Sequence, residues 1–184
     1  MKTFALLISL IITLTNHLHA AGSPVRLTVQ QNVKTKASGK GNSTTSQTRS
    51  LNITLNNISN VQMDNLSVKY TFFSRDMKGA DLDILNEGQQ TVSLTPVGKQ
   101  AFTTPEVTST YTTQHSEVKN SASNVRGPNG QNINVPSVTR VEASGRKIVG
   151  HAVRVFDGEK IVAEYYSEQG LQHKLITPKP AVAK

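Results

Sequence analysis

The sequence contains no cysteine, and this absence removes several kinds of chemistry at once. Without thiols the protein has no disulfide framework, no thiolate nucleophile and no cysteine for a lipid anchor. The fold must therefore be stabilised by burial alone, and a chain of 184 residues is long enough to bury a sizeable core. If such a chain is exported, it suits a bacterial envelope better than an animal extracellular space.

Aromatic residues are also scarce, because tryptophan is absent and only five phenylalanines and four tyrosines are present. Proteins that bind single-stranded nucleic acid stack bases on aromatic rings beside basic residues. The basic stretches of this chain contain no such rings, so no specific nucleic-acid binding is predicted. Tyr165 and Tyr166 must point to opposite faces of a strand. One of them is expected at the surface, which is thin support for a carbohydrate site.

Motifs of catalysis are missing as well, and no enzyme activity or cofactor is predicted. No Gly-x-Ser-x-Gly sequence marks a nucleophile. His115 and Glu117 would share one strand face, but a metal ion needs three or four ligands. His151 lies between Val149 and Val153 and is expected to be a packed or edge-facing histidine. A hydrolase remains an alternative only if a pocket joins His115 or His151 to a carboxylate and a nucleophile.

The first residues carry the pattern of a secretory signal peptide. Lys2 is followed by an apolar run over residues 4–14, and a small residue, Ala20, ends the segment. The apolar run is shorter than the roughly 20 residues that a membrane-spanning helix needs. We therefore predict a signal peptide over residues 1–20 and a secreted or periplasmic protein with no transmembrane span after cleavage.

The strongest structural signal is a β-hairpin over residues 146–167, where apolar residues occupy odd positions on both sides of a turn. A three-residue loop over 156–158 pairs odd positions with odd positions and brings Val153 opposite Ile161. The hydrophobic pattern favours this register, because a slip of one residue would turn every side chain to the other face. Gly158 is then predicted in the left-handed conformation.

The same alternation predicts a hairpin near the start of the mature chain. Apolar residues alternate over residues 25–30 and again over 51–56, and the stretch 34–48 between them is polar. A fold-back in the middle of that stretch brings Leu27 opposite Ile53. The alternative is that residues 34–48 form a disordered linker.

Further strands are predicted over residues 66–72, 91–95 and 101–113, the last interrupted by Pro105. The charged stretch 74–88 is either a loop or a short additional strand. With no helical period after the signal peptide, about seven strands predict an all-β, antiparallel two-sheet sandwich of the immunoglobulin type. The predicted domain spans residues 21–171, and a flexible tail is predicted over 172–184.

The motifs LNITLNNIS and LSVKYTFFS (residues 51–59 and 66–74) resemble the second and third strands of immunoglobulin-like domains in bacterial envelope proteins. The ending KIVGHAVRVFDGEKIVAEYYSE (residues 147–168) is similar to the last hairpin of such domains. The chain as a whole resembles small exported bacterial proteins with this layout and no assigned activity. The resemblance covers roughly residues 25–171. It implies a fold and a role in binding or spacing, and it carries over no functional residue.

Connection lengths predict where a binding site would lie. In an immunoglobulin sandwich successive connections alternate between the two ends, so the long polar connections 34–48, 74–89 and 119–145 should gather at one end. Loops held by a rigid scaffold often bind ligands. The alternative is that the long loops have no function and are tolerated because they cost little stability. The basic residues at this end predicted to bind are Lys36, Lys40, Arg75, Lys78 and Arg126.

The net charge of +8 favours acidic partners. The sequence therefore predicts a non-catalytic exported module that binds a protein or an anionic polysaccharide through the long-loop end. The alternative is a structural or assembly component of the envelope that adds strands of a partner to its sheet edges. The sequence does not predict the oligomeric state.

Overall fold

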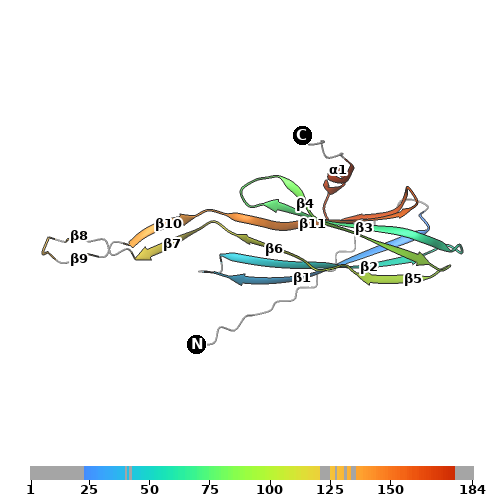
Figure 1. The fold of residues 1–184 in the computed structure, drawn as a ribbon, viewed down its shortest axis with the longest axis horizontal. Helices are drawn as coiled ribbons and strands as arrows, with labels where there is room; N and C mark the ends of the chain where they lie inside the picture. The colour runs from blue at the N-terminus through green and yellow to red at the C-terminus, as the bar shows by residue number, and fades with distance from the viewer. Residues whose placement is uncertain are drawn as a thin grey trace, which may run out of the picture.

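The computed structural model describes residues 23–39, 41, 43–120, 125–126, 128–130, 132–133 and 136–176, so the predicted signal peptide lies outside the described residues. Almost all elements in this part of the chain are strands (Figure 1). They are β1 (Val25–Ser38), β2 (Thr44–Asn57), β3 (Met63–Asp76), β4 (Leu82–Leu94), β5 (Lys99–Thr103), β6 (Val107–Thr112), β7 (His115–Asn120), β8 (Val125–Arg126), β9 (Asn132–Ile133), β10 (Pro136–Val141), β11 (Ser144–Asp157) and β12 (Lys160–Tyr166), followed by the helix α1 (Leu171–Ile176).

The long strands form two layers, and every pairing is antiparallel. In the first layer β2 pairs with β1 on one edge and with β5 and β6 on the other. The second layer has the order β12, β11, β3, β4. The layers are joined where Ser144 and Gly145 of β11 pair with β6. The prediction of an all-β fold is confirmed.

The break between β5 and β6 has a local cause. Pro105 has no amide hydrogen for the ladder, so the strand is interrupted there as predicted. The buried Thr104 bridges the gap, because its hydroxyl accepts a hydrogen bond from the Leu51 amide at 3.0 Å. β2 therefore keeps a partner for its backbone at the interruption.

The main core lies between the two layers. Most of its fully buried members come from β2 in one layer and from β3 and β11 in the other, and they include Leu51, Ile53, Leu55, Leu66, Val68, Phe72, Val153 and Val155. Each is an alternate residue of its strand, as expected for a face that packs against a second sheet. Burying such a side chain contributes roughly 1.5–3 kcal/mol.

The β1–β2 hairpin folds back in the polar stretch, as predicted, but its register differs by two residues. Leu27 lies opposite Leu55 and not opposite Ile53. The turn contains Gly39 and Gly41, both with positive φ, and this places its centre one residue later than predicted. A shift of two residues preserves the inward face. The strands also continue through most of residues 34–48, so the predicted loop is largely strand.

The β11–β12 hairpin confirms the predicted pairing of odd positions and corrects the register. Its turn is Gly158-Glu159, and Val153 lies opposite Tyr165 instead of Ile161. A two-residue turn would pair odd positions with even ones, but a bulge between Val155 and Phe156 restores the parity. Gly158 has a φ of 61°, the left-handed conformation that was predicted.

The helix α1 was not predicted, and it occupies residues that the sequence assigned to a tail. Leu171 is buried on the outer face of the second layer with Phe73 and Ala152. Gly150 makes this packing possible, because a Cβ there would lie 2.8 Å from a Leu171 methyl carbon. The folded part therefore extends to residue 176, and residues 177–184 lie outside the described part of the chain.

The long connections gather at one end of the layers, as predicted, but they are hairpins of extended strands and not loops (Figure 1). The third of them forms an arm in which β7 pairs with β10 and β8 with β9. Backbone bonds tie the ends together: the Met77 amide donates to the Gly145 carbonyl at 3.0 Å, and the Asn57 amide donates to the Gly98 carbonyl at 2.8 Å at the opposite, short-loop end.

Candidate binding site between the two layers

The five basic residues predicted to bind do not form one cluster among the residues that can be described. Lys36 is exposed on β1 of the first layer, and Arg75 and Lys78 are exposed at the end of β3 in the second layer. Lys40 lies outside the described residues, as does the side chain of Arg126. The structure thus brings three of them to the same end of the molecule, but on different layers.

Several other cations at this end are paired with acids. Lys34 contacts Glu106 at 2.5 Å, Arg140 contacts Glu142 at 3.2 Å, and Arg146 pairs with Asp83. All these pairs are at least partly exposed, so each contributes little to stability. They do reduce the positive potential of the end, which therefore carries charges of both signs.

A different group of polar residues lies inside the molecule. The inward face of β1 and β2 is apolar near the short loops, but the same parity continues into polar residues farther along. Gln31 follows Val29 on β1, and Arg49 and Gln47 follow Leu51 on β2. The space between the layers therefore has an apolar half and a polar half.

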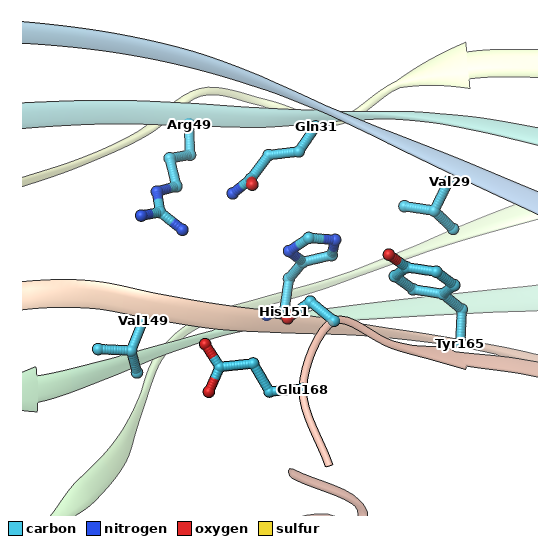
Figure 2. A pocket seen from close by; sticks show the side chains of 8 residues that line it. Val29, Gln31, Arg49, Val149, His151, Tyr165 and Glu168 are labelled. Carbon is cyan, nitrogen blue, oxygen red and sulfur yellow. Dashed lines mark hydrogen bonds between the residues drawn. The ribbon is translucent and has the colours of Figure 1, made fainter. Parts of the chain in front are cut away.

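The polar half contains a pocket of about 260 Å³. Strands of both layers supply its walls: β1 and β2 on one side, β11 and the end of β12 on the other (Figure 2). The lining residues are Val29, Gln31, Arg49, Val149, His151, Tyr165, Ser167 and Glu168. Figure 2 shows the side chains of Gln31, Arg49 and His151 directed toward the same space from opposite layers.

His151 is the most deeply buried polar residue of the pocket, with only 4% of its surface exposed. Its ring stacks on Tyr165 with centroids 5.6 Å apart, and its backbone amide donates to the Ser167 hydroxyl at 2.8 Å. Neither ring nitrogen has a hydrogen-bond partner. Burial, and then the nearby Arg49 charge, lower the pKa of His151 to about 4, so the ring is neutral at pH 7.

Arg49 faces His151 from the other layer. Burial lowers the pKa of its guanidinium, and the negative charge of Glu168 opposes this shift. Glu168 is exposed at the rim and forms no ion pair with Arg49 within the described residues. The buried Nε of Arg49 has no hydrogen-bond partner, and the same holds for Nε2 of Gln31.

These partnerless atoms are unusual. In folded proteins the large majority of buried polar side-chain atoms are hydrogen-bonded, and each exception destabilises the fold by about 1–3 kcal/mol. Nε of Arg49 and Nε2 of Gln31 are both donors. A group with negatively charged acceptor oxygens would satisfy them, since charge-assisted hydrogen bonds are the stronger kind.

The pocket joins a histidine, a hydroxyl and a carboxylate, which is the condition set for a hydrolase. The hydroxyl and the histidine ring do not share a hydrogen bond in this structure. A catalytic serine and histidine share a hydrogen bond between hydroxyl and ring nitrogen. Here the Ser167 hydroxyl accepts from the His151 backbone amide, and both ring nitrogens are without partners.

Arg49 and Gln31 were missed by the sequence analysis because they border a stretch that was interpreted as a loop. The alternation of inward and outward positions along the two strands could have revealed them. If the alternation of β1 and β2 is continued past the last apolar residues, Gln31 and Arg49 fall on the inward face. An arginine at an inward position is rare unless it is paired.

Among the residues that the structure describes, no group of three or more His, Asp or Glu side chains could hold a metal ion. In the same part of the chain, no helix is long and apolar enough to cross a membrane. Comparisons with models of protein families, with curated proteins and with solved structures find no match to this chain.

Proposed function

We propose that this protein is an exported, non-catalytic binding module with an immunoglobulin-like β-sandwich fold. The strand order supports this proposal. β1, β2 and β5/β6 correspond to strands A, B and E of such a sandwich, and β12, β11 and β3 correspond to G, F and C. β4 lies beside β3 and not beside β5, which departs from the constant-type arrangement.

The place of action is inferred from the N-terminal sequence. A basic residue, an apolar run and a small residue over residues 1–20 favour cleavage and release into the periplasm or the medium. An envelope protein meets both other proteins and anionic polysaccharides there. The net charge of +8 favours acidic members of either class.

One observation carries the proposal: Arg49 and Gln31 line a pocket between the two layers, and each carries a buried donor that has no hydrogen-bond partner. A cationic group that is partly desolvated attracts an anion more strongly than a surface lysine does. The pocket therefore supports binding of an acidic group better than the exposed basic residues at the long-hairpin end.

The test compares two acidic probes, immobilised polyglutamate and dextran sulfate, for retention of the purified full-length protein. We expect retention that falls with salt, is lost in Arg49→Met and persists when Lys36, Arg75 and Lys78 are all replaced by Ser. The reverse pattern would move the site to the long-hairpin end. No retention of the unaltered protein on either probe would contradict the proposal.

A second candidate function is a structural role through sheet edges, and the arm favours it. Among the described strands, β7 and β10 pair only with each other. Val118 and Val138 lie opposite each other on this arm and are 52% and 67% exposed. Such a two-stranded ribbon is only marginally stable alone. This role predicts self-association that does not weaken with salt, measurable by sedimentation.

A further inference from the structure

One edge of β11 is uncovered beside the pocket. β12 pairs with β11 from Ala152 to Asp157, and β6 pairs with it at Ser144 and Gly145. Because β3 occupies the opposite edge, β12 and β6 share this one. At residue 146 the Ser109 hydroxyl of β6 still donates to the Arg146 carbonyl at 2.6 Å. Over residues 147–150 no described strand pairs with this edge of β11, so it has an open stretch between two partners.

The pocket lies where β12 ends. The Ser167 amide still donates to the His151 carbonyl at 2.9 Å, and the chain then turns away through Glu168 toward α1. On the facing layer, the outer edge of β1 pairs with no described strand. β1 runs beside β12, since the Ser23 hydroxyl donates to the Val162 carbonyl. The open stretch of β11 and the open edge of β1 therefore border the same pocket.

We propose that the notch formed by the open stretch of β11 and the open edge of β1 receives an extended peptide strand of a partner protein. One acidic side chain of this strand enters the pocket between Arg49 and Gln31. The inference rests on the proposed function and names its partner. The peptide backbone pairs with the open stretch of β11, as in other complexes formed by strand addition. Alternate side chains of an added strand point between the layers, where the donors meet a carboxylate.

The rim restricts which strand fits. Val29, Val149 and Tyr165 are the apolar residues that line the pocket. The exposed carboxylate of Glu168 repels a second negative charge at the mouth. The preferred strand therefore has a single acidic residue flanked by uncharged ones.

The experiment titrates the full-length protein with a short capped peptide of alternating threonine and valine with one central glutamate. Its controls are the same peptide with glutamine and a version N-methylated along the backbone. We expect the glutamate peptide to bind about tenfold more tightly than the glutamine peptide. This difference disappears in Arg49→Met, is reduced in Arg49→Lys, which keeps the charge but not the planar fork, and grows several-fold in Glu168→Gln.

The outcomes separate this inference from the proposed function. Propionate serves as a carboxylate without a backbone, and its binding is followed through the amide resonances of His151 and Ser167. If propionate binds but the glutamate peptide binds no more tightly, or N-methylation changes nothing, strand addition is wrong and the anion pocket stands. If neither propionate nor peptide binds, both proposals are overturned. Arg49→Lys and Glu168→Gln keep the test valid should Arg49→Met fail to fold.

Discussion

The space between the two layers has halves with opposite properties. Near the short loops, Ile53, Leu55 and Val155 are fully buried in an apolar cluster. Toward the long hairpins, the same faces of the same strands present Gln31, Arg49 and other polar groups without hydrogen-bond partners. The backbone pairing of β1 with β2 is continuous across both halves, so it does not account for the difference.

The comparison separates what stabilises the protein from what it can bind. Burial of apolar area is the main favourable term in folding, and the apolar half supplies it. Unsatisfied donors oppose folding, so the polar half depends on the stability of its neighbour. A fold whose stability resides in one half can keep an unsatisfied, preorganised site in the other. The predictions below test this division.

The largest effect is expected in the apolar half. Leu55→Ala removes a fully buried side chain and should lower the free energy of unfolding by about 2–5 kcal/mol. Gln47→Ala in the polar half is the matched change, because Gln47 is also buried but its Oε1 has no partner. We expect it to change stability by less than about 1 kcal/mol. Urea denaturation measures both, and equal losses would contradict the division.

Acid should destabilise the protein through the polar half. The pKa of His151 is about 4 in the folded state and 6.5 as a free side chain, so the unfolded state binds more protons between these values. The contribution of the neutral His151 to the free energy of unfolding is therefore fully present above pH 6.5. It declines as the pH falls toward 4, by on the order of 3 kcal/mol. His151→Phe should flatten this part of the profile of unfolding free energy against pH. An unchanged slope would mean that other groups control it.

The junction of the layers should be sensitive to a single methyl group. Gly145 has a φ of +84°, and a Cβ there would lie 2.3 Å from the Thr110 carbonyl oxygen. Gly158 also has a positive φ, but nothing lies within 4 Å of its Cβ position. Gly158→Ala should cost about 1–2 kcal/mol, the conformational term alone, and Gly145→Ala should cost at least about 1 kcal/mol more. Thermal unfolding of the two variants compares them, and equal losses would show that the contact is relieved by a small shift.

The smallest effect on stability is expected when Glu168 is changed. Glu168→Gln removes an exposed charge that forms no ion pair within the described residues, so unfolding should shift by less than about 0.5 kcal/mol. A loss of 2 kcal/mol in chemical denaturation would instead identify Glu168 as the counter-ion of Arg49.

Alternation of apolar residues was enough to predict the main strands of the two layers, both hairpins and the end at which the long connections meet. It did not predict β7 and β10 of the arm, and only the end of β4 was predicted as a strand. It could not determine the registers, because a slip of two residues preserves the buried face and the position of a turn or bulge decides between them. Residues 34–48 were assigned to a loop because they are polar, although β1 and β2 continue through most of them. α1 was missed because its six residues are too few for a helical period.

The site was less accessible from sequence than the fold. His151 was expected to be packed or edge-facing because its position is part of an apolar alternation, and the structure shows that it is packed. Arg49 and Gln31 are inward because β1 and β2 extend beyond their apolar residues, and only strand length shows that. The basic residues that were chosen instead are exposed wherever their side chains are described, since charge alone favours the surface.

The measurement that tests the division most directly is the free energy of unfolding of Arg49→Met at neutral pH. If Arg49 is unpaired within the fold because its role is to bind a ligand, the variant should be as stable as the unaltered protein or more stable by up to about 2 kcal/mol. The reason is that an unsatisfied buried donor is replaced by an apolar side chain of similar length. A loss of about 3 kcal/mol or more would show that Arg49 belongs to a paired network of the fold. The polar half would then be a structural element and not a binding site.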